Sequence, residues 1–185
     1  ETFAGRGVSY CATCDGFFFR NKPIVVVGGG DSACEEALFL TRFGSSVTLI
    51  HRRDEFRASK IMQERVRSNP DITLMMNTVV ERVNGSDAGA ESITVRNRAT
   101  DEVTDVPANG IFVAIGHTPA TDFLHGALAL DDDGYILVDG ASTRTSVPGV
   151  FAAGDAVDRV YRQAISAAGM GCRAALDAQR YLSGD

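Results

Sequence analysis

The alternation of apolar and polar positions predicts one βαβ unit in the first third of the chain. Pro23 to Val27 is a short apolar run rich in β-branched residues, which is typical of a buried strand. A glycine cluster follows, and Asp31 or Ser32 can then cap a helix that runs to about Phe43 with a broad apolar face. Ser46 to Ile50 is the next strand-like run. The unit implies a parallel sheet with a right-handed crossover.

The middle of the chain predicts a second helix followed by several strands. The helix covers Ser59 to Ser68 and ends before Asn69-Pro70, because the residue before a proline avoids helical geometry. The turn residues Asn84-Gly85-Ser86 separate two of the strands that follow. The strand-like runs are Ile72–Met76, Val79–Val83, Ser92–Arg98, Val103–Val106 and Gly110–Ile115. Strands in direct succession indicate an antiparallel excursion inserted into the first domain.

Beyond the last of these strands, the chain is expected to cross to a second body of structure. Short strands are predicted at Tyr135–Val138 and Val150–Ala153, and a long helix from Gln163 to about Leu182. We therefore expect an α/β fold. It consists of a Rossmann-like domain with an antiparallel β excursion over residues 1–115, and a second, partial α/β domain over residues 116–185.

The glycine cluster fits a dinucleotide-binding loop. Gly28 to Ala33 matches the pattern G-x-G-x-x-G/A, in which Gly28 permits the tight turn and Gly30 lets the backbone approach a pyrophosphate. Ala33 permits close packing of helix on strand, and the N–H groups of Asp31 and Ser32 begin a helix whose N-terminus favours an anion. Glycine clusters are also common in ordinary turns. The position between a strand and a helix favours nucleotide binding.

The residues at the end of the second strand indicate which nucleotide binds. An NAD site usually has an acidic residue there to hold the ribose 2′-hydroxyl. This chain has His51-Arg52-Arg53 instead, with Arg57 four residues later. Guanidinium groups suit a 2′-phosphate because they stay charged and donate two hydrogen bonds at once. The sequence therefore predicts NADPH, and the alternative is a solvated basic turn beside Asp54 and Glu55.

The spacing of Cys11-Ala-Thr-Cys14 favours a redox-active pair. Two thiols at this spacing can form a disulfide within a tight turn, and Asp15 follows as a candidate proton donor or acceptor. A zinc knuckle would need two more ligands at suitable spacing, and none is evident. An inert pair is the other alternative. The remaining cysteines, Cys34 and Cys172, are expected to be small core residues.

Composition narrows the class of protein further. The net charge of −6 argues against general nucleic-acid binding, which needs a basic surface. No apolar run approaches the roughly 20 residues that span a bilayer, and no secretory signal is present. Four cysteines in 185 residues are too few for a disulfide-stapled secreted scaffold, so a cytoplasmic protein is expected.

Taken together, these motifs resemble the low-molecular-weight thioredoxin reductases. They stand in the order expected of that family and cover essentially the whole chain. Each motif alone is unspecific, whereas the combination is highly specific. The segments that resemble the family are Gly7–Arg20, Gly28–Ala33, His51–Arg57, Phe112–Pro119, Gly149–Asp155 and Tyr161–Cys172.

The resemblance implies a reductase in which FAD carries electrons from NADPH to the cysteine pair and on to thioredoxin. Cys14 is then the thiol next to the flavin, Cys11 the thiol that attacks the partner's disulfide, and Asp15 the acid/base. Helix N–H groups near the flavin ring can stabilise its reduced form. A homodimer is implied at full length. The further cofactor contacts implied are Ile115, Gly154, Asp155, Arg162, Gln163 and Ala164.

The family also has an N-terminal FAD half with its own glycine loop, and no second G-x-G-x-x-G occurs in this sequence. Residues 1–115 are therefore expected to form the NADPH domain, and residues 116–185 the C-terminal part of the FAD domain. We expect the chain alone not to sustain reduction of thioredoxin by NADPH.

Two alternatives to this function stay open, and the sequence argues against a third. The chain could be a non-catalytic NADPH-binding module, or the flavoprotein reductase of a peroxiredoxin system, which shares the same core. A ferredoxin-dependent relative would lose the nicotinamide site, and the arginine cluster argues against it.

Overall fold

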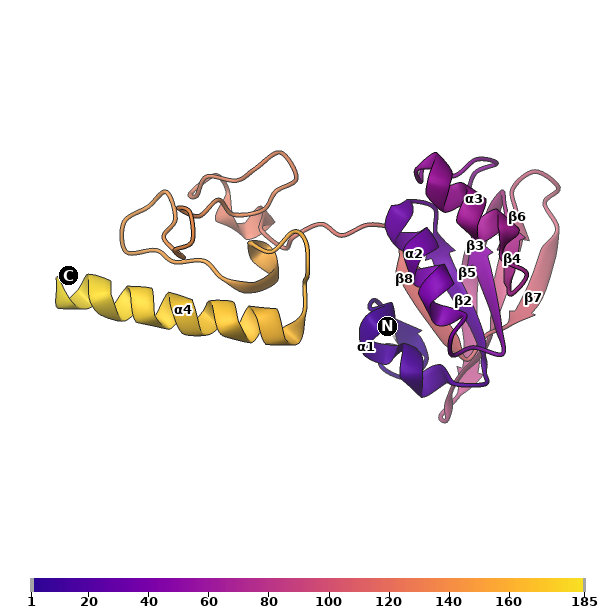
Figure 1. Ribbon diagram of the computed structural model, residues 1–185. Coiled ribbons are helices and arrows are strands. Elements are labelled where there is room, and N and C mark those ends of the chain that lie inside the picture. The colour runs from indigo at the N-terminus through magenta and orange to yellow at the C-terminus, as the bar shows by residue number, and fades with distance from the viewer. Residues whose placement is uncertain (1, 185) are drawn as a thin grey trace. The chain divides into compact units, whose positions relative to one another are not determined.

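A computed structural model describes residues 2–184 of the chain. Its contacts divide the chain into two compact units, one ending at Gly116 and the other beginning at His117 (Figure 1). Each unit is described by itself. No helix within the described residues is long and apolar enough to cross a membrane.

A five-stranded sheet lies at the centre of the first unit. Its strand order is β1-β8-β2-β3-β4, and every pairing in it is parallel. The strands are β1 Val8–Ser9, β2 Pro23–Gly28, β3 Ser46–Ile50, β4 Ile72–Met75 and β8 Gly110–Ala114. The parallel sheet and the βαβ unit were predicted from the sequence. The short β1, which comes directly before the cysteines, was not.

Two helices cover one face of this sheet. They are α2, Asp31–Leu40, and α3, Lys60–Ser68 (Figure 1). Helix α2 begins after Gly30 rather than after a side-chain cap at Asp31 or Ser32, because the Asp31 carboxylate binds Ser59 instead. The helix also ends earlier than predicted, since the chain turns after Leu40 and the Gly44 N–H donates to the Leu40 carbonyl.

A second sheet covers the opposite face of the parallel sheet. Its strands β5 Thr78–Ser86, β6 Gly89–Asn97 and β7 Val103–Pro107 are antiparallel and pair in that order. Successive residues of a strand point to opposite faces, and β2 illustrates the result. Ile24 and Val26 pack with the helices, whereas Val25 packs with Ile93 and Val95 of the second sheet. The first unit thus has two cores, one on each face of the parallel sheet.

The prediction of a turn at Asn84-Gly85-Ser86 is wrong. These residues belong to β5, and Gly85 pairs with Ala90 at an irregularity in the ladder. A Cβ at Gly85 would lie 2.1 Å from the Gly89 carbonyl oxygen. The glycine therefore permits a close approach of two strands, and a glycine inside a strand commonly marks such a bulge.

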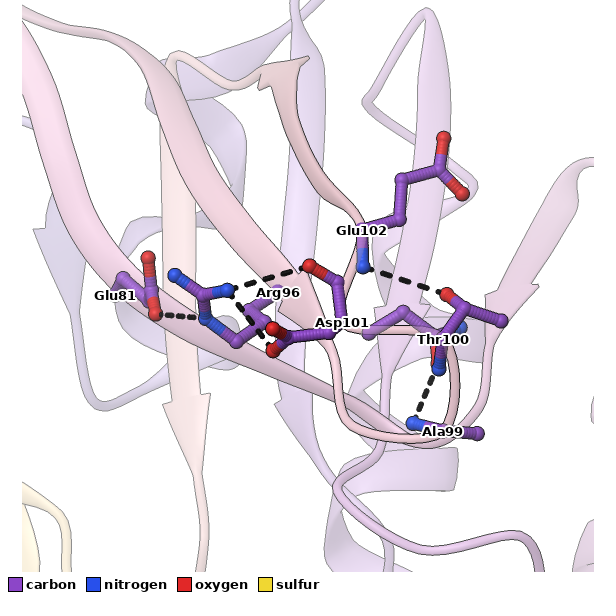
Figure 2. A network of polar contacts seen from close by, with 7 residues as sticks. Glu81, Arg96, Ala99, Thr100, Asp101 and Glu102 are labelled. Carbon is purple, nitrogen blue, oxygen red and sulfur yellow. Dashed lines mark hydrogen bonds and ion pairs between the residues drawn. The ribbon is translucent and has the colours of Figure 1, made fainter.

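Arg96 on β6 forms ion pairs with strand β5 and with the turn before β7 (Figure 2). Its Nε lies 2.6 Å from Oε1 of Glu81 on β5, and its Nη1 lies 3.0 Å from Oδ1 of Asp101 in the turn before β7. The turn has its own bonds, including the Glu102 N–H to Thr100 Oγ1 at 3.4 Å. These side chains are open to solvent, so each ion pair contributes little to stability.

The second unit has fewer regular elements. It contains the 3₁₀ turns η2, Asp122–Leu124, and η3, Gly154–Ala156, and the long helix α4, Ala164–Ser183. The predicted helix is therefore present. The strands predicted at 135–138 and 150–153 are only the isolated bridges Leu130–Ile136 and Arg144–Phe151. These segments bind loops rather than a neighbouring strand: the Ile136 N–H, for example, donates to the Ala156 carbonyl at 2.9 Å.

Helix α4 contacts the loops of its unit. Asp177 Oδ2 accepts hydrogen bonds from the N–H of Thr143 at 2.9 Å and from its hydroxyl at 2.8 Å. No side chain of the helix is buried, and Ile165 is 84% exposed. Cys172 is exposed as well. The prediction that it is a core residue is wrong, because the apolar face of α4 on which it lies has no covering partner within the described residues. Cys34 is buried, as expected.

Candidate functional site

The glycine loop joins β2 to α2 with a tightly packed beginning and an open end. A Cβ at Gly28 would lie 2.3 Å from the Ala114 carbonyl oxygen and 2.6 Å from the Cβ of Ala33, so only glycine fits there. At Gly30, by contrast, an added Cβ would meet nothing within 4 Å. The loop therefore packs on its own domain at Gly28 and leaves space for a ligand at Gly30.

The N-terminus of α2 faces that space without a side-chain cap. Gly30 is the N-cap residue, and its carbonyl accepts the first intrahelical bond from the Cys34 N–H at 3.2 Å. The N–H groups of residues 31–33 consequently have no partner within the helix. N–H groups without an intrahelical partner and the positive end of a ten-residue helix form a site suited to a phosphate group.

His51 connects the glycine loop to the basic loop that follows β3. Its Nδ1 lies 3.1 Å from the Gly28 carbonyl oxygen, and its Nε2 lies 3.0 Å from the Glu55 carbonyl oxygen. The imidazole is buried and packs against the ring of Phe56, with centroids 5.3 Å apart. His51 therefore holds the two loops together, and both of its nitrogens already face protein carbonyls.

Further contacts fix the second half of the basic loop to the glycine loop. The N–H groups of Arg57 and Ala58 donate to the Gly29 carbonyl at 2.8 and 3.1 Å. Asp31 Oδ1 accepts bonds from the Ser59 hydroxyl at 2.7 Å and from the Ser59 N–H at 2.8 Å. These two bonds hold the pKa of Asp31 below its usual range. The two loops are thus one preorganised unit.

The arginine side chains of the basic loop take no part in this network. Arg52, Arg53 and Arg57 are exposed, and they form no ion pair within residues 2–184. Their charges are therefore available to an anionic ligand.

The backbone of these arginines is held by the residues that flank the second sheet, Asn77 just before β5 and Arg98 just after β6. The Arg98 Nη1 donates to the Arg52 carbonyl at 3.4 Å, and the Asn77 N–H donates to the Arg53 carbonyl at 2.9 Å. Sequence reasoning missed both Arg98 and Asn77. Of the two, only Asn77 could have been suspected from the sequence. It adopts a left-handed conformation with φ of 53°, which asparagine tolerates better than most residues.

Cys11 and Cys14 form a disulfide in the turn after β1. Helix α1, Ala12–Asp15, follows Cys11, and the 3₁₀ turn η1, Gly16–Phe19, continues from it. The Cys14 N–H donates to the Cys11 Sγ at 3.2 Å, and the Asp15 N–H donates to the Cys11 carbonyl at 3.1 Å. Within the described residues, no group of three or more histidine, cysteine or acidic side chains is placed to hold a metal.

Asp15 has a partner that sequence reasoning did not identify. The hydroxyl of Ser9, at the end of β1, donates to Asp15 Oδ2 at 2.6 Å and accepts the Cys11 N–H at 3.1 Å. Ser9 is only 5% exposed. Because Ser9 lies outside the Cys-x-x-Cys spacing, only the unexpected strand β1 brings it to the carboxylate.

An exposed aromatic surface adjoins the disulfide turn. Tyr10, Phe17 and Phe18 are 71%, 60% and 70% exposed, although large apolar side chains are usually buried. The Arg20 guanidinium lies over the Phe17 ring, 5.5 Å from its centroid. A surface of this kind commonly marks a site of protein–protein contact.

The redox turn and the glycine loop lie at different places along α2. Gly16 follows the redox turn and packs against Leu40 and Phe43, near the C-terminal end of the helix. The glycine loop lies at the N-terminal end. Ten helical residues span about 15 Å. The two sites therefore lie toward opposite ends of the helix.

In the second unit, the expected cofactor residues gather around Asp158. Gly154, with φ of 75°, and the exposed Asp155 begin η3, while Arg162, with φ of 49°, precedes Gln163 at the N-cap of α4. Burial alone would raise the pKa of Asp158. Three backbone N–H groups of residues 160–162 and the Ser166 hydroxyl outweigh burial and lower it.

Asp158 therefore fixes the turn that presents Arg162 and Gln163, and sequence reasoning missed it. Ile115, the expected contact in the first unit, follows β8 and is 74% exposed.

Comparison with known proteins gives the class of the chain. The family model described as pyridine nucleotide-disulphide oxidoreductase matches residues 1–171. The chain belongs to this family.

Within the family, the chain is similar to proteins named thioredoxin reductases. It is 58% identical over 183 residues to the thioredoxin reductase of Mycolicibacterium smegmatis, covering 99% of this chain and 58% of that protein. It is 59% identical over 183 residues to the bifunctional thioredoxin reductase/thioredoxin of Mycobacterium leprae, covering 40% of that protein.

A solved structure is similar over the same length. The crystal structure of thioredoxin reductase from Streptococcus pyogenes superposes with a TM-score of 0.89 at 42% identity, covering 97% of this chain and 58% of that one. The chain thus spans less than two thirds of the relatives that it matches.

Proposed function

We propose that the chain is the NADPH-binding and dithiol-bearing part of a thioredoxin-disulfide reductase. In this proposal, electrons pass from NADPH through FAD to the Cys11–Cys14 disulfide and on to thioredoxin. The main support is one observation: the same folded unit holds a disulfide in an accessible turn and a glycine loop beside arginines that form no ion pair within residues 2–184.

The first unit fits the diphosphate and the 2′-phosphate of NADPH. Open space at Gly30 and the N–H groups at the start of α2 suit the diphosphate, with Asp31, Ser32 and Ala33 as the nearby helix residues. Arg52, Arg53 and Arg57 suit the 2′-phosphate, because guanidinium groups bind phosphate with paired hydrogen bonds. Gly28 and His51 would act indirectly by shaping and fixing these loops. Residues 1–115 are accordingly proposed as the NADPH domain.

The second unit fits only part of an FAD site. Gly154 and Asp155 are proposed to contact the ribityl and phosphate portion, and Arg162, Gln163 and Ala164 the ring side at the N-terminus of α4. Ile115 is proposed as a further cofactor contact. FAD supplies a two-electron carrier, which the chemistry needs because a disulfide is a poor direct acceptor of hydride. Residues 116–185 are therefore proposed as the C-terminal part of the FAD domain.

The cysteine pair is proposed to exchange with thioredoxin. The Cys11 thiolate would attack a sulfur of the thioredoxin disulfide, and the other thioredoxin sulfur would leave as a thiolate and take a proton. The Cys14 thiolate would then attack the mixed disulfide at Cys11, so that the second thioredoxin sulfur leaves and the Cys11–Cys14 disulfide forms again. Cys14 is the proposed thiol on the flavin side, and Asp15 the acid/base.

Thioredoxin is the proposed partner, and the exposed Tyr10, Phe17 and Phe18 beside the disulfide support a protein partner rather than a small disulfide. We further propose a cytoplasmic location, which the low cysteine count favours, and a homodimer at full length, as the sequence resemblance implies.

The test is an NADPH-dependent thioredoxin reduction assay on the full-length protein with bound FAD. Cys11→Ser and Cys14→Ser should each abolish turnover, whereas Cys172→Ser, which changes an exposed thiol outside the turn, should leave it unchanged. Turnover that survives Cys11→Ser would contradict the proposal.

A further inference from the structure

Ser9 links the central sheet of the first unit to the redox turn. Its backbone lies in β1 and pairs with Phe112 of β8, so the parallel sheet fixes its position. Its hydroxyl is buried and lies 2.6 Å from Asp15 Oδ2, a separation typical of a hydroxyl donating to an ionised carboxylate. The same oxygen accepts the Cys11 N–H at 3.1 Å. One hydroxyl therefore contacts both the proposed acid/base and the backbone of the proposed attacking cysteine.

The strand that bears Ser9 is itself firmly held. The Ile111 N–H donates to the Gly7 carbonyl at 2.7 Å, and Gly7 adopts φ of 126°. A Cβ at Gly7 would lie 2.4 Å from the Cβ of Ala90 on β6. Both sheets thus fix the chain just before Ser9. The four-residue helix α1 that contains Asp15 buries only Ala12.

The hydroxyl of Ser9 can serve Asp15 in either protonation state. A serine hydroxyl has one donor and two acceptor sites. When Asp15 is ionised, the hydroxyl donates to its Oδ2. When Asp15 is protonated, the hydroxyl can accept the acid proton as a hydrogen bond and turn its own hydrogen to the Cys11 carbonyl oxygen, 3.4 Å away.

We infer that Ser9 is a positioning residue that holds the Asp15 carboxyl group in place while that group gains and loses its proton. The inference rests on the proposed function, in which Asp15 exchanges a proton with a cysteine sulfur of the pair. Ser9 itself transfers no electron and forms no covalent bond.

The test measures how fast dithiothreitol reduces the Cys11–Cys14 disulfide of the 185-residue chain across a range of pH. A dithiothreitol thiolate attacks one sulfur, and the other leaves as a thiolate that takes a proton. The second dithiothreitol thiol then closes the cyclic reagent disulfide and releases the remaining cysteine. Proton delivery by a positioned acid contributes about a hundredfold or more, so Asp15→Asn should slow the reaction by that order.

Ser9→Ala should slow the same reaction by about tenfold, as expected for the loss of one hydrogen bond to a charged group. The attacking reagent thiolate makes the rate of every variant rise with pH. Ser9→Ala should displace the additional pH dependence that Asp15→Asn removes. In the Asp15→Asn background, Ser9→Ala should add nothing, because its effect acts through the carboxyl group. The pair Ser9→Thr and Ser9→Val gives a second comparison of nearly equal shape, in which only the threonine keeps the hydroxyl and only the threonine should retain the wild-type profile.

The possible outcomes distinguish the inference about Ser9 from the proposed acid/base role of Asp15. If Asp15→Asn slows the reaction but Ser9→Ala does not, Ser9 does not position the carboxyl group. Equal slowing by Ser9→Ala in both backgrounds would mean that it merely loosens the turn, and the inference would also be wrong. If Asp15→Asn leaves both rate and pH profile unchanged in a protein with wild-type unfolding behaviour, the proposed acid/base role fails and the inference fails with it.

Discussion

Gly29 lies so close to His51 that a Cβ on the glycine would be 2.0 Å from the imidazole Nδ1. The side chain at position 29 must therefore be absent for the histidine to reach the carbonyls of Gly28 and Glu55. We predict that Gly29→Ala destabilises the first unit, since it leaves buried polar groups unpaired at about 1–3 kcal/mol each. Chemical denaturation of the variant measures this loss.

The neighbouring glycine provides the matched control. Gly30 has an extended backbone and open space where a Cβ would point, so Gly30→Ala should unfold like the wild type. It should nevertheless weaken NADPH binding, because the methyl group occupies the space proposed for the diphosphate. If Gly30→Ala binds NADPH normally, or if Gly29→Ala is as stable as the wild type, the assignment of the loop is wrong.

The second prediction concerns the choice of nucleotide. Replacing Arg52 and Arg53 together by alanine should weaken NADPH binding far more than NADH binding, since each lost charge-assisted contact costs about 1.5–3 kcal/mol. Titration calorimetry with both nucleotides gives the two affinities. The control is Arg42→Ala with Arg65→Ala, which removes two exposed charges outside the basic loop. Equal losses of affinity for both nucleotides would show that Arg52 and Arg53 do not bind the 2′-phosphate.

The four cysteines are predicted to differ sharply in reactivity. Burial, together with the negative charges of Asp31 and Glu35, raises the pKa of the Cys34 thiol to about 11. Cys34 should therefore resist iodoacetamide near pH 8, whereas the exposed Cys172 should react. Mild reduction should add Cys11 and Cys14 to the labelled residues. Peptide mapping that finds Cys34 labelled as readily as Cys172 would contradict the packing of α2.

The bond between Asp31 and Ser59 should make the connection of the two loops dependent on pH. The folded-state pKa of Asp31 lies below its ordinary value of 3.8, so its contribution to stability is fully present above that value. The contribution is lost as the pH falls through the lowered folded-state pKa. Asp31→Asn should therefore be less stable than the wild type at neutral pH, and the difference should shrink below about pH 3.8.

Glu35→Gln is the control for this measurement, because Glu35 is an exposed acid on the same helix. A stability difference for Asp31→Asn that stays constant from neutral to acid pH would show that the charge of Asp31 does not hold the Ser59 contact.

The features whose place in the fold the sequence predicts well are those that depend on local spacing. The glycine loop, the arginines after β3 and the Cys-x-x-Cys pair each lie within a few residues, and strand–loop–helix order gives them context. Ser9 and Arg98 could not be found in this way. Ser9 reaches Asp15 only because β1 joins the sheet, and Arg98 reaches the Arg52 carbonyl across 46 positions of sequence.

The errors have the same physical origin. Asn84-Gly85-Ser86 has the composition of a turn, but pairing with β6 holds it in a strand. Cys172 has helical spacing with other apolar residues, but such a pattern does not say whether anything covers that face. The short strands predicted in the second unit needed a neighbouring strand, which single-sequence patterns do not supply.

The most direct test of the central claim measures the redox state of Cys11 and Cys14 after NADPH is added anaerobically to the full-length, FAD-containing protein. The thiols are alkylated and mapped by mass spectrometry, without thioredoxin or any other reductant. We predict that NADPH converts the disulfide to two labelled cysteines at positions 11 and 14, and that Arg52→Ala with Arg53→Ala requires a much higher NADPH concentration for the same conversion. A disulfide that remains intact while the flavin is reduced by NADPH would contradict the account.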